Sequence, residues 1–213
     1  MKVAIFDLDG TLVNSLADIA EAANHAMKQL GFPTHELDKF NYFVGDGLKE
    51  LIHRVLPQDR QDKYDEALEI YKEYYGTHYM VKTSVYDGIK PLLEKLSENG
   101  VTLAVASNKT EVFTRNVVSH YFGDSLFSAV YGRAENRATK PDPAILNVIM
   151  QQLDVKPSDC FMIGDTNVDI RTGKNAEIKT IGCLWGFRTL QELKEAGADF
   201  IAQKPEDIAE FIL

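Results

Sequence analysis

Short apolar runs alternate with helix-like segments over most of the chain, and this alternation constrains the fold more than any other feature. The runs are short and apolar enough to be strands buried on both faces, as in a parallel sheet. They are Val3–Phe6, Val101–Ala106, Ala129–Tyr131, Cys160–Ile163 and Thr180–Leu184, with a weaker one at Phe200–Ala202. Strands that alternate with helices predict an α/β protein with a doubly wound parallel sheet covered by helices on both faces.

Three of the helix-like segments carry end signals. The segment Pro91–Ser97 begins with a proline and stops before Asn99-Gly100. Asn108 is a candidate cap for a helix over Thr110–Tyr121, and Asp142 for a helix over Pro143–Leu153.

Residues 14–83 interrupt this alternation, because they contain no convincing strand. Apolar residues recur at helical spacing instead, and a Gly31-Phe32-Pro33 stop follows the first helical stretch. The stretches are marked by Leu16, Ile19, Ala23, Met27 and Leu30, by Leu48, Leu51, Ile52 and Val55, and by Tyr64, Ala67, Leu68, Tyr71 and Tyr75. We expect a small all-helical domain at 14–83, inserted after the first strand of a core formed by 1–13 and 84–213.

Composition limits the classes of partner. The 213 residues carry a net charge of −9, which argues against nucleic acid or an anionic membrane as the main partner but leaves a small anionic substrate open. Cys160 and Cys183 lie in strand-like runs and are expected to be reduced core thiols. The N-terminus does not resemble a signal peptide, and no apolar run approaches the roughly 20 residues of a spanning helix, so we expect a cytoplasmic protein.

Two acidic clusters follow predicted strands. Asp7 and Asp9, two residues apart and followed by the turn-permitting Gly10, come directly after the first strand. The run Gly164-Asp165-Thr166-Asn167-Val168-Asp169 follows the strand at Cys160–Ile163. Ligands of open parallel sheets bind beyond the carboxyl ends of the strands, and carboxylate oxygens suit Mg²⁺. The alternative for the second cluster is that its acids cap the next helix.

Two further segments offer groups for an anion. Ser107 and Asn108 end the strand at Val101–Ala106, and Lys140 opens the run Lys140-Pro141-Asp142-Pro143. The two prolines stiffen the backbone around Asp142, so that Lys140 is held at a fixed place before a helix. A lone lysine is more often a solvated surface residue, and the rigid setting is what favours a functional one.

In this order, the residues resemble the haloacid dehalogenase superfamily of aspartate-nucleophile phosphatases. The resemblance covers nearly the whole chain and includes four motifs, which are Asp7-x-Asp9-Gly10-Thr11, Ser107, Lys140, and Gly164-Asp165-x-x-x-Asp169. It implies a Rossmann-like core in which the first strand is central, and it implies that the helical insert is a cap that closes over the site.

The resemblance also implies a role for each residue. Asp7 would attack phosphorus, as a carboxylate already ionised at neutral pH, and Asp9 would protonate the leaving alcohol and then activate water. Mg²⁺ would be bound by Asp7, the backbone carbonyl of Asp9, and Asp165, with Asp169 supporting these ligands rather than binding the ion. Lys140 would orient Asp7 and neutralise charge. The phosphate would be held by Gly10, Thr11, Ser107, Asn108 and Lys140.

The substrate is less constrained. The segment Phe43-Val44-Gly45-Asp46-Gly47-Leu48 resembles the cap loop of the phosphoglycolate phosphatase group, in which Gly45, Asp46 and Gly47 would contact a small phosphorylated metabolite; the alternative is a glycine-rich turn between helices. Arg133 and Arg137 precede Lys140, and a solvated loop is the favoured interpretation over substrate contact. Pyrophosphate hydrolysis and β-phosphoglucomutase-like phosphoryl transfer stay open, as does a non-catalytic phosphate-binding regulatory module. A monomer or a homodimer is expected.

Overall fold

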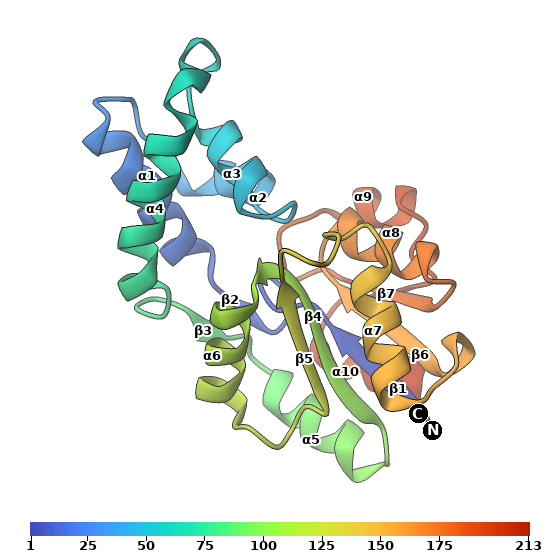
Figure 1. Cartoon of the computed structure of the whole chain (residues 1–213). Coiled ribbons are helices and arrows are strands. Elements are labelled where there is room, and N and C mark those ends of the chain that lie inside the picture. The colour runs from blue at the N-terminus through green and yellow to red at the C-terminus, as the bar shows by residue number, and fades with distance from the viewer. The chain divides into compact units, whose positions relative to one another are not determined.

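The computed structural model describes residues 1–213 and divides into two compact units (Figure 1). One unit comprises Met1–Val13 and Val85–Leu213, and the other comprises Asn14–Ser84. The sequence placed the insert at 14–83. Two short strands, β2 (Val13–Asn14) and β3 (Ser84–Val85), contain the two crossings between the units and pair as a two-stranded sheet.

The larger unit contains a six-stranded sheet with the order β5-β4-β1-β6-β7-β8. Every neighbouring pair whose register is defined runs parallel, which confirms the predicted α/β doubly wound class. The strands are β1 (Val3–Phe6), β4 (Thr102–Thr110), β5 (Ala129–Arg133), β6 (Cys160–Gly164), β7 (Lys179–Cys183) and β8 (Phe200–Ala202). The central β1 is fully buried and has neighbours that lie about a hundred or more residues away in the chain.

Helices connect these strands. They are α5 (Ile89–Glu98), α6 (Glu111–Phe122), α7 (Ala144–Leu153), α8 (Asn167–Asn175), α9 (Leu190–Glu195) and α10 (Pro205–Ile212), with a 3₁₀ turn, η3, at Pro157–Asp159. Residues of α7 such as Leu146 and Ile149 join one core cluster with Val3 and Ile5 of β1, which point to the same face of the sheet. The cluster also includes Cys160, and Cys160 and Cys183 are both free, buried thiols, as predicted.

Three helix starts differ from the sequence prediction. Helix α5 begins two residues before Pro91, after a Gly88 whose φ of +84° places it in the left-handed region. Helix α6 begins at Glu111 rather than Thr110, and Asn108 does not cap it because Asn108 is still part of β4. Helix α7 begins at Ala144, where the Asp142 carboxylate accepts a hydrogen bond from the Ala144 amide at 2.9 Å.

Strand β4 is longer than predicted because it contains a bulge. It was expected to end at Ala106 but continues to Thr110. Ala106 lies opposite Tyr131 and Thr110 lies opposite Arg133, so β4 has more residues in this interval than β5. Bulges redirect side chains near the ends of strands. The residues of this one are Ser107, Asn108 and Lys109.

The smaller unit is helical, apart from the residues at its two ends that belong to β2 and β3. It contains α1 (Leu16–Gln29), α2 (Phe40–Phe43), α3 (Leu48–Val55) and α4 (Tyr64–His78), with 3₁₀ turns η1 (Leu37–Lys39) and η2 (Gln58–Lys63). Helices α1 and α4 pack along each other, and their buried faces include Ala23, Met27, Tyr71 and Tyr75. Its apolar residues thus form a core separate from that of the sheet.

A buried carboxylate ties the two ends of the helical unit together. Asp18 in the first turn of α1 is 1% exposed and accepts hydrogen bonds from the Lys82 and Thr83 amides and the Thr83 hydroxyl, with the shortest at 2.7 Å. These donors belong to the last residues of the unit, 64 and 65 positions away. Asp18 therefore closes the helical unit at the point where the chain enters and leaves it.

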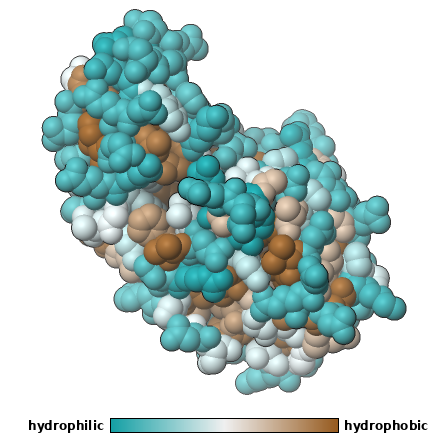
Figure 2. Space-filling model, in the orientation of Figure 1, coloured by the Kyte–Doolittle hydropathy of each residue, from teal (hydrophilic) through white to brown (hydrophobic).

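The surface shown in Figure 2 is mostly hydrophilic. On the face in Figure 2, teal hydrophilic residues predominate on both units, and the brown residues form separate groups rather than one continuous surface. No helix is both long and apolar enough to cross a bilayer.

Replacing Asp18 with alanine is expected to destabilise the helical unit. The Lys82 and Thr83 amides would lose their acceptor in a site with little access to water, and each lost bond to a charged group costs about 1.5–3 kcal/mol. Hydrogen exchange of amides in residues 14–84 would measure the loss of protection. Glu21→Ala, which removes only an exposed ion pair with Lys82, is the matched control and is expected to change protection little. Equal effects of the two variants would contradict this role for Asp18.

Candidate active site

Three buried carboxylates meet where the strand order of the sheet reverses. Asp7 follows β1, and Asp165 and Asp169 belong to the turn and first helical residues after β6, the strand beside β1. Oxygens of Asp7, Asp165 and Asp169 lie within 4.8 Å of one another. The chain turns outward to β4 and β5 on one side of β1 and to β6, β7 and β8 on the other, and crevices at such reversals are where α/β proteins bind ligands.

Asp7 is anchored through one oxygen of its carboxylate. Its Oδ1 accepts a hydrogen bond from the Leu8 amide at 2.7 Å and lies 3.0 Å from the Lys140 ammonium. The residue is 8% exposed. The contacts at Oδ1 therefore set the direction of the Asp7 carboxylate.

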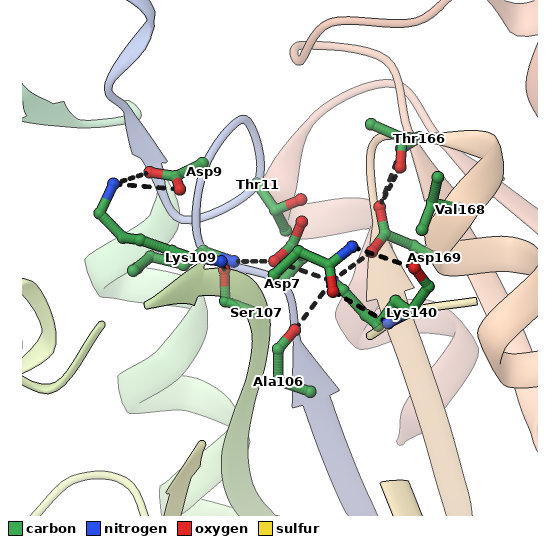
Figure 3. Close-up of polar contacts among 12 residues, drawn as sticks. Asp7, Asp9, Thr11, Ala106, Ser107, Lys109, Lys140, Thr166, Val168 and Asp169 are labelled. Atoms are coloured by element: carbon green, nitrogen blue, oxygen red, sulfur yellow. Dashed lines mark hydrogen bonds and ion pairs between the residues drawn. The ribbon is translucent and has the colours of Figure 1, made fainter. Parts of the chain in front are cut away.

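The Lys140 ammonium contacts two of the three carboxylates. Its Nζ donates to the Ala106 carbonyl at 2.9 Å and contacts Asp169 at 2.6 Å and Asp7 at 3.0 Å, so each of its protons has an acceptor (Figure 3). Burial alone would lower the pKa of Lys140, but the carboxylates of Asp169 and Asp7 together raise it above its ordinary value. Lys140 is thus held in its charged form next to Asp7 and Asp169.

Asn108 fixes the backbone of Lys140. Its side-chain Oδ1 accepts from the Lys140 amide at 2.9 Å, and its Nδ2 donates to the Lys140 carbonyl at 3.1 Å. The sequence suggested a helix cap and a phosphate contact for Asn108. The structure places its amide on Lys140 instead of on a helix end, and the phosphate contact stays a prediction.

Asp169 combines the two interpretations left open by the sequence. Its Oδ2 accepts from the Thr166 amide at 3.0 Å and from the Thr166 hydroxyl at 2.7 Å, within a capping box at the start of α8. Its Oδ1 bonds to Lys140. Asp169 therefore both caps α8 and contacts Lys140 in the site.

Asp165 is held by a loop whose role the sequence left unassigned. Its Oδ1 accepts from the Thr11 hydroxyl and its Oδ2 from the Phe187 amide, both at 2.8 Å. Glycines pack directly on it, since a Cβ added to Gly10 would lie 2.4 Å from its Oδ2 and one added to Gly186 would lie 2.3 Å from its Cβ. The tryptophan of this loop, Trp185, donates to the Thr11 carbonyl at 3.0 Å. Gly10 and Thr11, predicted as phosphate contacts, therefore also position Asp165.

The carboxylates repel one another in a buried space. Burial raises the pKa of Asp7 to about 8, with Asp169 and Asp165 adding to the effect and Lys140 opposing it. Burial and Asp169 raise the pKa of Asp165 to about 7, against hydrogen bonds from Phe187 and Thr11. These shifts oppose the ionised state that the sequence analysis expected for Asp7, and their main cause is the burial of carboxylates close together.

This donor set fits a divalent cation. Three buried carboxylates face one buried lysine, which leaves two negative charges uncompensated when all are ionised. A hard ion with oxygen ligands would balance that charge, and Mg²⁺ is such an ion. Asp7, Asp165 and Asp169 are the residues whose oxygens lie close enough together to hold it.

Asp9 faces a lysine that the sequence analysis did not select. The Lys109 ammonium lies 2.9 and 3.1 Å from the two Asp9 oxygens, and its side chain is 5% exposed. In Figure 3, Asp7 lies between the Lys109–Asp9 pair and the Lys140–Asp169 pair. Lys109 directly follows Ser107 and Asn108, and this position was the one sequence signal that could have selected it. The direction of its side chain follows only from the bulge in β4.

Ser107 and the arginines of the loop before Lys140 have structural contacts. The Ser107 hydroxyl is buried and accepts from the Lys109 amide at 3.2 Å. Arg137 donates to Glu111 at 2.6 Å and to the Gly132 carbonyl at 2.9 Å, and its guanidinium lies over the Tyr131 ring. A solvated side chain was expected here, but Arg137 is packed against its neighbours. Arg133 is exposed.

The glycine-rich segment of the helical unit is a turn with internal bonding. Gly45 and Gly47 have φ values of +114° and +90°, which favour glycine, and Gly47 precedes α3. Asp46 forms an ion pair with Arg54 at 2.6 Å, and Arg54 also donates to the Tyr42 and Phe43 carbonyls. The geometry accounts for the glycines as a turn, and substrate contact by Gly45, Asp46 or Gly47 stays a prediction.

Comparisons with known proteins agree with this architecture. The sequence model of the haloacid dehalogenase-like hydrolase family matches residues 4–183. A phosphoglycolate phosphatase of Aquifex aeolicus is 32% identical over 100% of this chain and 97% of its own, and one of Colwellia psychrerythraea is 34% identical over 92% and 90%. A crystal structure of a predicted phosphoglycolate phosphatase from Lactobacillus delbrueckii subsp. bulgaricus has 31% identity and a TM-score of 0.94 over 100% and 98% of the two chains.

The cluster of buried acids lies at the switch point of a parallel sheet, which is where α/β proteins bind ligands. The chain belongs to the haloacid dehalogenase-like hydrolase family.

Replacing Gly186 with alanine is expected to lower activity at least tenfold. The new methyl group would lie 2.3 Å from the Asp165 Cβ and would force that carboxylate out of position, and small displacements of this kind cost up to about a hundredfold. Gly76→Ala is the matched control, because nothing lies within 4 Å of a Cβ there. Phosphate release and Mg²⁺ affinity of the two variants measure the effect. Wild-type values for Gly186→Ala would contradict the proposed packing.

Stabilisation by Mg²⁺ is expected to grow with pH. Because the pKa values of Asp7 and Asp165 are raised in the folded protein, the metal-free fold holds more protons than the unfolded chain, and its stability falls as pH rises from about 4 to about 8. Mg²⁺ competes with those protons and adds about 2.7 kcal/mol at a hundred times its dissociation constant. The thermal midpoint with EDTA and with Mg²⁺, compared at about pH 5 and about pH 8, measures the difference. A gain that is larger at the lower pH would contradict the site.

Proposed function

We propose that this protein is an Mg²⁺-dependent phosphatase that hydrolyses a small phosphomonoester through an aspartyl-phosphate on Asp7. The observation that carries the proposal is the Asp7 carboxylate itself. Its Oδ1 is fixed by the Leu8 amide and Lys140, and in the proposed reaction its Oδ2 attacks beside Asp165. Membership of a hydrolase family and relatives named phosphoglycolate phosphatase support the same class of reaction.

In the proposed reaction Asp7 is the nucleophile, and Asp9 first donates a proton and then accepts one. Asp7 Oδ2 forms a bond to phosphorus as the bond from phosphorus to the ester oxygen breaks, and Asp9 gives its proton to that leaving oxygen. A water molecule then attacks the phosphorus, Asp9 takes a proton from the water, and Asp7 is released together with inorganic phosphate. Lys140 neutralises negative charge next to Asp7 throughout, because its ammonium stays charged.

Mg²⁺, held by Asp7 and Asp165, would supply positive charge that offsets the repulsion between the Asp7 carboxylate and an anionic phosphate. Thr11, the Phe187 amide and Gly186 keep Asp165 in place for this purpose. The Asp9 backbone carbonyl, adjacent in the same turn, is the further ligand that the family resemblance suggests.

A 2-phosphoglycolate-like molecule is the substrate that we propose. The support is the naming of relatives that share about a third of their residues with this chain across almost its full length. Phosphate release from 2-phosphoglycolate, pyrophosphate and sugar phosphates, measured with Mg²⁺, separates the alternatives. Isomerised sugar phosphate without free phosphate would instead indicate a phosphotransferase, and phosphate binding without turnover would indicate a regulatory module.

Replacing Asp7 with asparagine is expected to reduce turnover on the order of 10⁴-fold or more, because the nucleophile is lost. The same variant is expected to be at least as stable as the wild type without metal, since it removes one of three mutually repelling carboxylates. Phosphate release and the thermal midpoint in EDTA measure the two effects. Turnover at the wild-type rate would contradict the assignment of Asp7 as the nucleophile.

A further inference from the structure

We propose that Lys109 binds an anionic group carried by the leaving alcohol, which makes the site selective for phosphoesters with a second negative charge next to the ester oxygen. The inference rests on the proposed function, because it assumes that Asp9 meets the leaving oxygen. It assigns a specificity-determining role to a residue outside the four motifs.

The bulge in β4 fixes Lys109 from several directions. Its backbone amide donates to the Ser107 hydroxyl at 3.2 Å, and its carbonyl accepts from the Thr114 hydroxyl of α6 at 3.1 Å. Its side chain is buried to 5% exposure, and the ammonium reaches both oxygens of Asp9. A lysine held in this way is preorganised, unlike a flexible surface lysine that would lose side-chain entropy on binding.

Distances around Asp9 place Lys109 beside the leaving group. A proton donor to the ester oxygen must approach it within hydrogen-bonding distance, about 2.6–3.2 Å. Lys109 lies within the same distance of the same carboxylate. A substituent on the carbon attached to the ester oxygen would therefore lie within reach of the ammonium, whereas the transferring phosphate faces Asp7.

The two buried lysines differ in the groups that they contact. Lys109 reaches both oxygens of Asp9, the residue proposed to meet the leaving oxygen, so an anion on the leaving alcohol would lie beside its ammonium. Lys140 does not serve this group, because its three protons already bond to Asp7, Asp169 and Ala106. In this proposal Lys140 serves the nucleophile Asp7, and Lys109 serves the leaving group next to Asp9 (Figure 3).

A carboxylate one carbon from the ester oxygen fits these requirements. 2-Phosphoglycolate has that arrangement, and 2-phosphoglycolamide keeps its phosphate and shape while a neutral amide replaces the carboxylate. Hydrogen bonds to charged groups contribute about 1.5–3 kcal/mol, which corresponds to about a 10- to 150-fold preference for the carboxylate.

The test compares kcat/KM for the two substrates in the wild type, in Lys109→Met and in Lys109→Arg. We expect the wild type to prefer 2-phosphoglycolate at least tenfold, Lys109→Met to lose that preference, and Lys109→Arg to retain part of it. An equal loss of kcat/KM for both substrates in Lys109→Met would show that Lys109 acts only through Asp9 or the phosphate, and would overturn the proposal.

A binding measurement keeps the test independent of turnover. In the Asp7→Asn background with Mg²⁺, calorimetry with 2-phosphoglycolate and 2-phosphoglycolamide should give tighter binding of the carboxylate, and adding Lys109→Met should remove the difference. Equal affinities before that change would overturn the role of Lys109. A wild type that shows this binding preference but releases phosphate from neither ester would instead refute the proposed phosphatase activity.

Discussion

The site depends on one ammonium group placed among acids that would otherwise repel one another. Lys140 touches Asp7 and Asp169 and is anchored to the Ala106 carbonyl, while Asn108 clamps its backbone. Ions buried without compensation are costly in a folded protein, and Lys140 compensates part of the charge that collects at the carboxyl ends of β1 and β6. The remaining imbalance of charge is what makes the same place suitable for a divalent metal ion.

Several residues serve the fold and the site at once. Asp169 caps α8 with one oxygen and bonds Lys140 with the other. Gly10 both permits a turn at a φ of +87° and leaves space for Asp165. A substitution at such a residue would disturb both a turn or helix start and the groups of the site. The two therefore constrain together which residue can occupy the position.

The sequence was sufficient for the sheet and for the acids at its edge. Continuous apolar runs identified β1 and β6, and the parallel topology that follows from strand–helix alternation brought Asp7 and Asp165 to the same end of the sheet. Local signals failed where tertiary contacts decide the outcome. Asparagine is a common helix-capping residue, but the Asn108 side-chain amide bonds to the backbone of Lys140, 32 residues away.

Other features depend on geometry that no local pattern carries. The bulge of β4 directs Lys109 towards Asp9, and the loop that contains Gly186 and Phe187 reaches Asp165 across the site. Raised pKa values of Asp7 and Asp165 likewise arise from burial and from neighbours far apart in sequence. Composition and periodicity describe none of these, because they contain no information about which side chains share a buried space.

The position of β1 at the centre of the sheet has a consequence for synthesis on the ribosome. Asp7 directly follows β1, but the neighbouring strand β6 ends at residue 164 and the amide that holds Asp165 belongs to Phe187. A nascent chain can fold the helices of residues 14–84 from local contacts while β1 still lacks a partner on either edge. The cluster of Asp7, Asp165 and Asp169 therefore forms only after Phe187 has been synthesised, and a chain released before that point lacks the amide that holds Asp165.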